Sequence, residues 1–180
     1  MIANFHAKAI HAMEGGELHS FFGRRADAVE ALVAEHGGKG YTDLDAFLSD
    51  PELEIVTIAT PSGAHLEPAL AAAKAGKHVI CEKPLEVTPE RIDQMIAACD
   101  EAGVTLSGIF NRRFNPAMAH FKMAVDAGRF GRLTLCDAYV KWWRTQAYYD
   151  SGAWRGTWAL AGGRALMNQS IHLVHQLLYL

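Results

Sequence analysis

The sequence predicts an α/β fold, with a mostly parallel sheet followed by the start of an α+β C-terminal domain. Over residues 1–110, short apolar runs alternate with amphipathic segments of helical period, which is the pattern of repeated strand-helix units. From residue 111 this alternation stops and aromatic residues become frequent. We therefore place an incomplete first domain at residues 1–110 and the beginning of a second domain at residues 111–180.

The elements of residues 1–110 follow from hydrophobic periodicity and from residues that begin and end helices. Thr88 and Pro89 are typical of an N-cap and a first-turn proline, and Gly76 and Gly103 are typical of helix ends. We expect helices over residues 2–13, 26–36, 65–75 and 88–103, and strands over residues 17–22, 54–59, 77–81 and 104–109.

The second part of the chain has a different pattern. Asn115 and Pro116 predict the start of a helix that ends near Gly128. Residues 133–144 read as one long aromatic-rich strand, and residues 163–180 carry apolar positions that suit a helix with one buried face.

Both ends of the pattern are abrupt. The chain opens on a helix, without the strand that precedes the first crossover of a dinucleotide-binding unit and without a G-x-G-x-x-G segment. The predicted sheet is therefore Rossmann-like but lacks its first strand. At the other end the apolar periodicity of the predicted helix continues up to the last residue, Leu180, so we interpret the sequence as part of a longer protein.

Composition narrows the function classes. Half of the 180 residues are hydrophobic and the formal net charge is -3, with acids and bases interspersed. There is no basic stripe for nucleic acid and no cationic amphipathic face for a membrane, so a small-molecule partner is expected. Cys81, Cys99 and Cys136 lie within apolar patterns, which predicts buried free thiols and a cytoplasmic location; no signal peptide or spanning segment is visible.

Glu82-Lys83-Pro84 is the strongest chemical signal, because it follows an apolar strand. Ligands of open α/β sheets bind beyond the carboxyl ends of the strands. Proline holds the preceding residue extended, and burial lowers the pKa of a lysine toward the range useful for proton transfer. Glu82 would instead favour the ammonium, so the net shift stays open at the sequence level. A surface lysine at an ordinary turn is the alternative.

Four segments in series resemble the Gfo/Idh/MocA family of oxidoreductases. They are residues 60–65 (TPSGAH), 82–84 (EKP), 154–158 (WRGTW) and 162–172 (GGRALMNQSIH). The resemblance implies a Rossmann domain, then an α/β domain with a large open sheet that commonly serves oligomerisation, so the parent protein is expected to be a homo-oligomer. It also implies an NAD(P)-dependent oxidoreductase that transfers hydride to or from a sugar, inositol or related polyol or keto compound.

The resemblance implies Lys83 as the catalytic lysine, His172 as the active-site histidine and Asn168 as a residue that orients a hydroxyl. His175 stands where the family usually has aspartate, and Arg164 replaces a glycine. A zinc site at His172 and His175 lacks an accompanying cysteine or carboxylate cluster, so no metal is expected.

The cofactor-binding residues implied by the resemblance begin at the tail of the glycine-rich segment, where Ala3 takes the place of a glycine. They are Ile2, Ala3, Thr60, Pro61, His65, Glu82, Lys83, Asn111 and Trp158, together with Arg24 or Arg25. Gly23 occupies the place where an NAD enzyme usually carries an acid for the ribose 2′-hydroxyl, and the arginines could pair with a 2′-phosphate. NADP is therefore favoured over NAD. Turn chemistry and helix capping are the alternative roles for Thr60, Pro61 and His65.

The aromatic residues of the second part suit either a carbohydrate pocket or a packing surface. They are Trp142, Trp143, Tyr148, Tyr149, Trp154 and Trp158. A competing function remains, because the missing phosphate loop is also expected of a non-catalytic fragment or of an interaction module that keeps the fold.

Overall fold

The computed structural model describes residues 2–163 and 165–180, so Met1 and Arg164 lie outside the described residues. The strands are β1 (Ser20–Phe22), β2 (Lys39–Tyr41), β3 (Ile55–Ile58), β4 (His78–Cys81) and β5 (Leu106–Gly108). The α-helices are α1 (Ile2–Ala12), α2 (Ala26–His36), α3 (Leu44–Leu48), α4 (Leu66–Lys74), α5 (Pro89–Ala102), α6 (Pro116–Asp126), α7 (Gln146–Asp150), α8 (Trp158–Ala161) and α9 (Ile171–Tyr179). Short 3₁₀ segments are η1 (Ser62–Ala64) and η2 (Asn111–Phe114), and η3 (Ala165–Ser170) is a π-helix.

Every strand pair among the described residues is parallel, which confirms the predicted fold class. The strands form two separate sheets, however. β1 pairs with β2, and β3, β4 and β5 form a second sheet in that order. Since β1 and β3 exchange no ladder hydrogen bonds, the predicted single sheet is divided between two clusters of secondary structure.

Local sequence signals account for where the helices begin and end. The Thr88 hydroxyl accepts a hydrogen bond from the Arg91 N–H, and Pro89 occupies the first turn of α5. Gly103 ends α5 in the left-handed region, with φ of 67°. The side chain of Asn115 accepts from the Ala117 N–H and begins α6 in the same way. Capping thus confirms the predicted starts of both helices.

Two apolar clusters support the two sheets. The larger one joins β3 and β4 to α3, α4 and α5, and its most buried side chains include Val79, Cys81, Met95 and Cys99. The alanines of α4 allow that helix to lie close to α5, because small side chains permit close approach. The smaller cluster packs Ala7 of α1 against Phe21 and Val29 beside the other sheet.

The strand expected over residues 133–144 is wrong: this segment has no regular secondary structure. A strand needs a neighbour to accept its backbone hydrogen bonds, and no other strand lies in the described part of the chain after residue 108. For the same reason Cys136 is exposed, contrary to the prediction of a buried thiol, whereas Cys81 and Cys99 are buried and free. The short elements β2, α3, α7 and α8 were not predicted.

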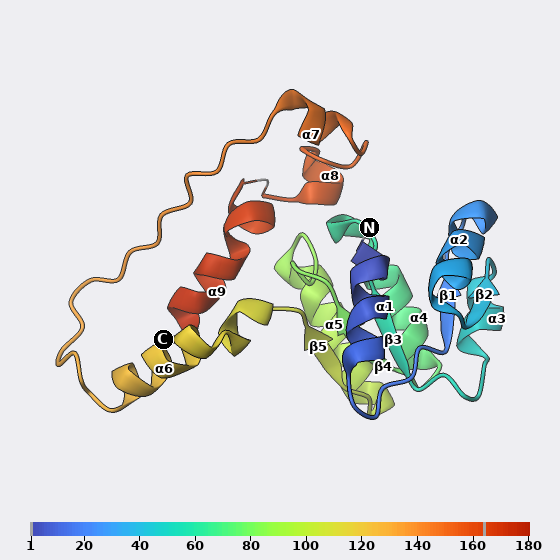
Figure 1. Cartoon of the computed structure of the whole chain (residues 1–180), viewed down its shortest axis with the longest axis horizontal. Helices are drawn as coiled ribbons and strands as arrows, with labels where there is room; N and C mark the ends of the chain where they lie inside the picture. The colour runs from blue at the N-terminus through green and yellow to red at the C-terminus, as the bar shows by residue number, and fades with distance from the viewer. Residues whose placement is uncertain (1, 164) are drawn as a thin grey trace.

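Figure 1 shows how these elements are arranged. Helices α1 to α5 surround the strands in one part, while α6 and α9 lie beside each other in a second part, and residues 133–145 form a wide arc from α6 to α7. The helix predicted over 163–180 is divided into the π-helical η3 and the α-helical α9. No described helix is both long enough and apolar enough to cross a membrane.

The second part returns to the first at α8, which packs against η1. Close approach depends on Gly63, because a Cβ at this position would lie 2.3 Å from the carbonyl oxygen of Ala159 and 2.9 Å from Cα of Leu160. Both are backbone atoms, so neither can move aside independently. Gly63 therefore lets α8 cover the turn that follows β3.

We predict that Gly63→Ala lowers the free energy of unfolding by about 1–3 kcal/mol through overpacking and displaces α8. Urea denaturation followed by tryptophan fluorescence measures this loss. The matched control is Gly16→Ala, whose Cβ would meet the end of the flexible Met13 side chain. Equal stability of the two variants would contradict the role of Gly63.

Candidate active site

The carboxyl ends of β3 and β4 carry the candidate site, because the polar motifs singled out above follow these two adjacent parallel strands. The turn after β3 contains Thr60 and Pro61, and the segment after β4 contains Glu82, Lys83 and Pro84. The Thr60 hydroxyl donates to the carbonyl of Ala64 at 2.8 Å. The peptide bond between Lys83 and Pro84 is cis.

His65 links the two strand ends from inside the protein. Its Nε2 lies 2.9 Å from the Thr60 carbonyl oxygen, and its Nδ1 lies 3.0 Å from the Pro84 carbonyl oxygen and 3.1 Å from that of Leu85. The residue is only 1% exposed. The ring therefore lies between carbonyl oxygens of the turn after β3 and of the segment after β4, and the ring nitrogen that carries the hydrogen donates to the carbonyl on its side.

Glu86 is a buried carboxylate that the sequence analysis did not identify. It is 0% exposed and accepts hydrogen bonds from the backbone N–H groups of His65, Leu66 and Val87 and from Arg91. Burial by itself raises its pKa, but the hydrogen bonds from Arg91 and from these N–H groups outweigh burial, so the pKa is lowered. The ionised carboxylate accepts from backbone N–H groups at the N-terminus of α4, and it thereby fixes the Lys83 segment to that helix.

The Lys83 ammonium lies inside the site and donates to the carbonyl of Asn168 at 3.1 Å. Burial lowers the pKa of Lys83, against the opposing charges of Glu82 and Tyr148. The balance left open by the sequence is therefore resolved in favour of a lysine that loses its proton more readily than an exposed one.

Glu82 is bound by a histidine of α1. Its carboxylate lies 3.1 Å from Nε2 of His6 and accepts from the backbone N–H of Lys83. Burial raises the pKa of Glu82, but the hydrogen bonds from His6 and Lys83 outweigh it and lower the pKa. Sequence reasoning missed His6, because nothing in its own segment indicates a partner 76 residues away.

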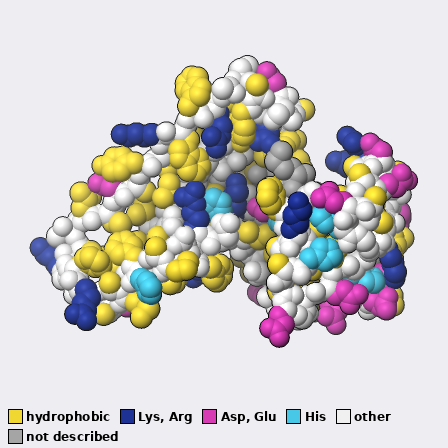
Figure 2. Space-filling view, viewed as in Figure 1, with side chains coloured by type: hydrophobic (Ala, Val, Ile, Leu, Met, Phe, Trp, Pro, Cys, Tyr) yellow, Lys and Arg dark blue, Asp and Glu magenta, His cyan; other side chains and the backbone are white. Residues whose placement is uncertain are grey.

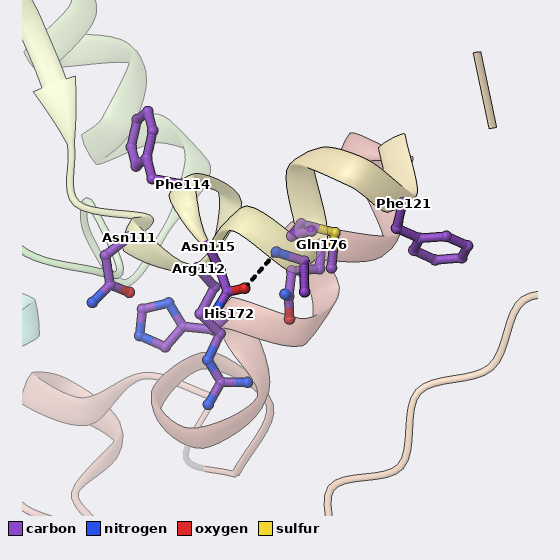
Figure 3. A pocket seen from close by; sticks show the side chains of 9 residues that line it. Asn111, Arg112, Phe114, Asn115, Phe121, His172 and Gln176 are labelled. Atoms are coloured by element: carbon purple, nitrogen blue, oxygen red, sulfur yellow. Dashed lines mark hydrogen bonds between the residues drawn. The ribbon is translucent and has the colours of Figure 1, made fainter. Parts of the chain in front are cut away.

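His172 of α9 is near enough to Lys83 for the charge of the lysine to act on it. Burial lowers its pKa first, and the positive charges of Lys83 and Arg112 lower it further. His172, Asn111 and Arg112 line an open cavity of about 920 Å³ between η2, α6 and α9. Figure 3 shows the His172 ring beside the side chains of Asn111 and Arg112. A neutral imidazole at a cavity wall can donate to or accept from a hydroxyl.

Asn168 lies beside Lys83. It is its backbone carbonyl that contacts Lys83, while the residue lines a small hollow together with Tyr148, Arg155 and Gln169. The Gln169 amide donates to the Tyr148 hydroxyl at 2.9 Å, and Arg144 donates to the Gln169 side-chain oxygen at 3.0 Å. This network was also missed, since its members are scattered over irregular chain.

The remaining predicted residues lie around this centre. Ile2 and Ala3 form the first turn of α1, and that turn carries no acidic side chain. Trp158 begins α8 and is 70% exposed. Arg24 and Arg25 follow β1 on the other sheet; Arg25 pairs with Asp27 at 2.8 Å, whereas Arg24 is exposed.

These positions allow a defined chemistry. Lys83 and His172 both have a lowered pKa, and they are near enough for the charge of the lysine to act on the histidine, so a proton can be taken from or returned to a hydroxyl bound beside them. The α1 N-terminus offers its positive dipole end and free N–H groups to an anion such as a pyrophosphate. The observed residues therefore fit a dinucleotide cofactor beside an acid-base pair.

One further polar cluster lies away from this centre. Asp50 accepts from His19, Lys39 and Tyr41, and Glu52 also contacts Lys39. His19, Asp50 and Glu52 are near enough to one another to hold a metal ion, but the Lys39 ammonium already binds both carboxylates. This cluster ties β1 and β2 to the loop before β3.

Comparison with known proteins agrees with this geometry. Residues 1–110 match the GFO/IDH/MocA profile, described as an oxidoreductase family with an NAD-binding Rossmann fold. Residues 118–180 match the GFO/IDH/MocA C-terminal domain.

Curated relatives include two sugar oxidoreductases. The chain is 35% identical over 164 residues to 1,5-anhydro-D-fructose reductase of Ensifer adhaerens, covering 88% of the chain and 47% of the relative. It is 36% identical over 140 residues to levoglucosan dehydrogenase of Pseudarthrobacter phenanthrenivorans, covering 77% and 36%. The chain thus spans about half the length, or less, of these relatives.

Solved structures show the same likeness. WlbA dehydrogenase from Bordetella pertussis, in complex with NADH and UDP-GlcNAcA, matches with a TM-score of 0.89 and 36% identity over 98% of this chain and 51% of that one. Levoglucosan dehydrogenase in complex with NADH and levoglucosan matches with a TM-score of 0.84 and 29% identity over 99% and 50%.

We predict that His65→Ala lowers the free energy of unfolding by about 2–4 kcal/mol, because it leaves a cavity and removes the ring donor from a buried carbonyl. Chemical denaturation monitored by circular dichroism measures the loss. His120→Ala is the control, since His120 is exposed on α6 and makes no hydrogen bond among the described residues. If both variants unfold at the same denaturant concentration, His65 does not hold the two strand ends together.

Proposed function

The chain belongs to the Gfo/Idh/MocA family of oxidoreductases, and from this premise we propose the reaction that its residues serve. The reaction is hydride transfer between a nicotinamide cofactor and a hydroxyl or keto carbon of a sugar-like compound. Because the chain spans about half the length of its relatives, the activity is proposed for a protein of their length.

The position of Lys83 carries this proposal. Oxidation of a carbinol removes a hydride from carbon and a proton from oxygen; bound NAD(P)⁺ accepts the hydride, and a neutral lysine amine accepts the proton. In the reverse direction the ammonium returns the proton to the carbonyl oxygen. Burial of Lys83 lowers its pKa, which favours the neutral amine that the oxidation requires.

His172 and Asn168 are proposed to orient the reacting hydroxyl. His172 lines the cavity and has a lowered pKa, so its neutral ring can accept or donate one hydrogen bond. The Asn168 carbonyl holds the Lys83 ammonium in place, and its amide side chain borders the neighbouring hollow. Asn111 and Trp158 are proposed to border the cofactor on this side.

For the cofactor we propose the first turn of α1, at Ile2 and Ala3, as the pyrophosphate site, and the turn at Thr60 and Pro61 as the nicotinamide side. Arg24 favours NADP, because Gly23 provides no acid and Arg24 makes no ion pair among the residues described. Arg25 is already paired with Asp27. Among the relatives, scyllo-inositol 2-dehydrogenase IolW is named as NADP-dependent.

The substrate class is proposed from the relatives, whose names include levoglucosan, inositol and 1,5-anhydro-D-fructose enzymes. The exposed rings of the second part, such as Trp143 and Tyr139, support the proposal that the protein forms homo-oligomers. The free thiols of Cys81 and Cys99 support a cytoplasmic location.

We predict that Lys83→Ala in the full-length protein lowers kcat about 100-fold or more, the usual contribution of an acid-base group, while cofactor affinity stays largely intact. Absorbance of the reduced nicotinamide measures turnover, and its fluorescence measures binding. Lys74→Ala, at the exposed end of α4, is the control. Turnover unchanged in Lys83→Ala would remove the lysine from its role, and no turnover of any sugar by the wild type would favour a non-catalytic protein.

The pH profile provides a second readout for the same lysine. The oxidation rate should rise with pH through a pKa below the ordinary lysine value of 10.5, because burial lowers it. The reduction rate should fall over the same range. In Lys83→Arg, both the rise of the oxidation rate and the fall of the reduction rate with pH should be lost, since an arginine stays protonated. A rising limb retained in Lys83→Arg would assign the titration to another group.

We predict that Arg24→Ala lowers the ratio of kcat/KM for NADPH to that for NADH by about tenfold or more, through loss of a charge-assisted hydrogen bond to the 2′-phosphate. Arg24→Lys keeps the charge and should retain most of the ratio. Steady-state kinetics with NADPH and with NADH measure this ratio of kcat/KM values. A ratio unchanged by Arg24→Ala would exclude Arg24 as the reader of the 2′-phosphate.

A further inference from the structure

Three arginines and three aromatic rings form a continuous stack beside the proposed active site, here called the arginine ladder. Each guanidinium carbon lies 4.5 to 5.5 Å from the centroid of a neighbouring ring. Along the stack, cation and ring alternate in the order Arg112, Trp142, Arg144, Tyr148, Arg155 and Trp154. These residues come from η2, from the irregular segment before α7, from α7 and from the loop before α8, so only the tertiary structure brings them together.

The arginine ladder borders Lys83 at its centre and His172 at one end. Tyr148 is near enough to Lys83 for its charge to act on the lysine, and the hydrogen bond from Gln169 fixes the Tyr148 hydroxyl. At the end of the ladder, Arg112 lines the same cavity as His172. An anionic group bound by the ladder would therefore lie beside the acid-base pair.

The ladder arginines have no acidic partners. Within residues 2–163 and 165–180, no ion pair includes Arg112, Arg144 or Arg155. The nearby Glu82 is already bound by His6 and by a backbone N–H. Figure 2 shows Lys and Arg side chains gathered around the hollow between the two parts of the molecule.

Buried donors of the ladder also lack acceptors. The Nε atoms of Arg144 and Arg155 are buried and make no hydrogen bond. Arg144 donates to Gln169 and to the Trp143 carbonyl, and both Arg144 and Arg155 also hydrogen-bond the Tyr148 hydroxyl, so none of these partners is a carboxylate. The three arginines are half-buried, and buried polar atoms are normally paired, so clustered guanidinium groups without a carboxylate indicate that a counter-charge comes from outside the chain.

The rings explain how the arginines stay together despite their mutual repulsion. Stacking on an aromatic face stabilises a guanidinium and keeps its plane fixed, with the N–H edge left for a planar or tetrahedral anion. A general nucleic-acid site does not fit, because the chain is acidic overall and its acids and bases are interspersed along the sequence.

Resting on the proposed function, we propose that the arginine ladder binds an anionic group of the substrate. The substrate is then a sugar that carries a carboxylate or a phosphate, and a neutral sugar is a poor one. Carboxylate and phosphate share the chemistry that the guanidinium edge recognises, namely oxygens that accept paired N–H donors. The ladder sets substrate choice, while Lys83 serves proton transfer.

The first test compares charged and neutral ligands of nearly equal shape on the wild-type chain. Titration calorimetry with D-glucuronate and D-glucuronamide, and with D-glucose 6-phosphate and D-glucose, tests the two anions separately. We expect at least one anionic ligand to bind about tenfold or more tightly than its neutral counterpart, with a difference that shrinks at high salt. Equal affinity within both pairs, or no binding by any ligand, would overturn the proposal, and binding of inorganic phosphate as tight as that of the sugars would reduce it to an anion site without sugar recognition.

The second test removes the charge from the ladder. Arg144→Gln and Arg155→Gln should each weaken binding of the preferred anionic sugar about tenfold and leave its neutral counterpart unchanged. Arg155→Lys should keep part of the affinity, and Arg132→Gln, an exposed arginine outside the ladder, is the matched control. Thermal unfolding identifies any variant that fails to fold, in which case the wild-type comparison alone decides. Unchanged anion affinity in folded variants would show that the ladder serves only packing.

Turnover in the full-length protein separates this proposal from the proposed function. If anionic and neutral sugars are oxidised with equal kcat/KM, the ladder proposal is wrong and the oxidoreductase function stands. If no sugar is oxidised but the charge preference in binding persists and is lost in Arg155→Gln, the proposed reaction is wrong and the anion site stands. Lys83→Ala should abolish turnover without changing the charge preference.

Discussion

The hydrogen bonds of His65 are the interaction on which the rest of the site depends. A lysine at the end of one strand can act on a ligand held by the next strand only if the two strand ends keep a fixed separation. The buried His65 ring contacts carbonyls of both segments, and Glu86 fixes the same region to the start of α4. Neither residue needs to touch a ligand for the site to require it.

Burial then sets the chemistry of Lys83. α8 lies over η1 through the close approach at Gly63, and the segment that follows it brings the Asn168 carbonyl to the lysine. Covering the lysine lowers its pKa, while His6 occupies the neighbouring carboxylate of Glu82. The same return of the chain assembles the arginine ladder, so the groups for proton transfer and those for anion binding share one structural origin.

Much of the fold could be predicted from local signals. Thr88, Pro89 and Gly103 begin and end α5, and Asn115 begins α6, because capping acts within one turn of helix. The strand expected over residues 133–144 failed for the opposite reason: aromatic residues favour a strand only where a neighbouring strand pairs with it. The division into two sheets was likewise invisible, because pairing between distant strands leaves no local pattern.

The sequence by itself determined the family, the alternation of strands and helices, and Lys83 as the candidate acid-base residue, since each depends on residues adjacent in the chain. Only the tertiary structure decided that the His65 ring faces inward, that His6 pairs with Glu82, and that distant arginines stack into one ladder. Those contacts depend on how whole elements pack, and the pKa of a lysine depends on what covers it. Glu82-Lys83-Pro84 marks where chemistry can occur, and the chain folded over it determines which charges surround it.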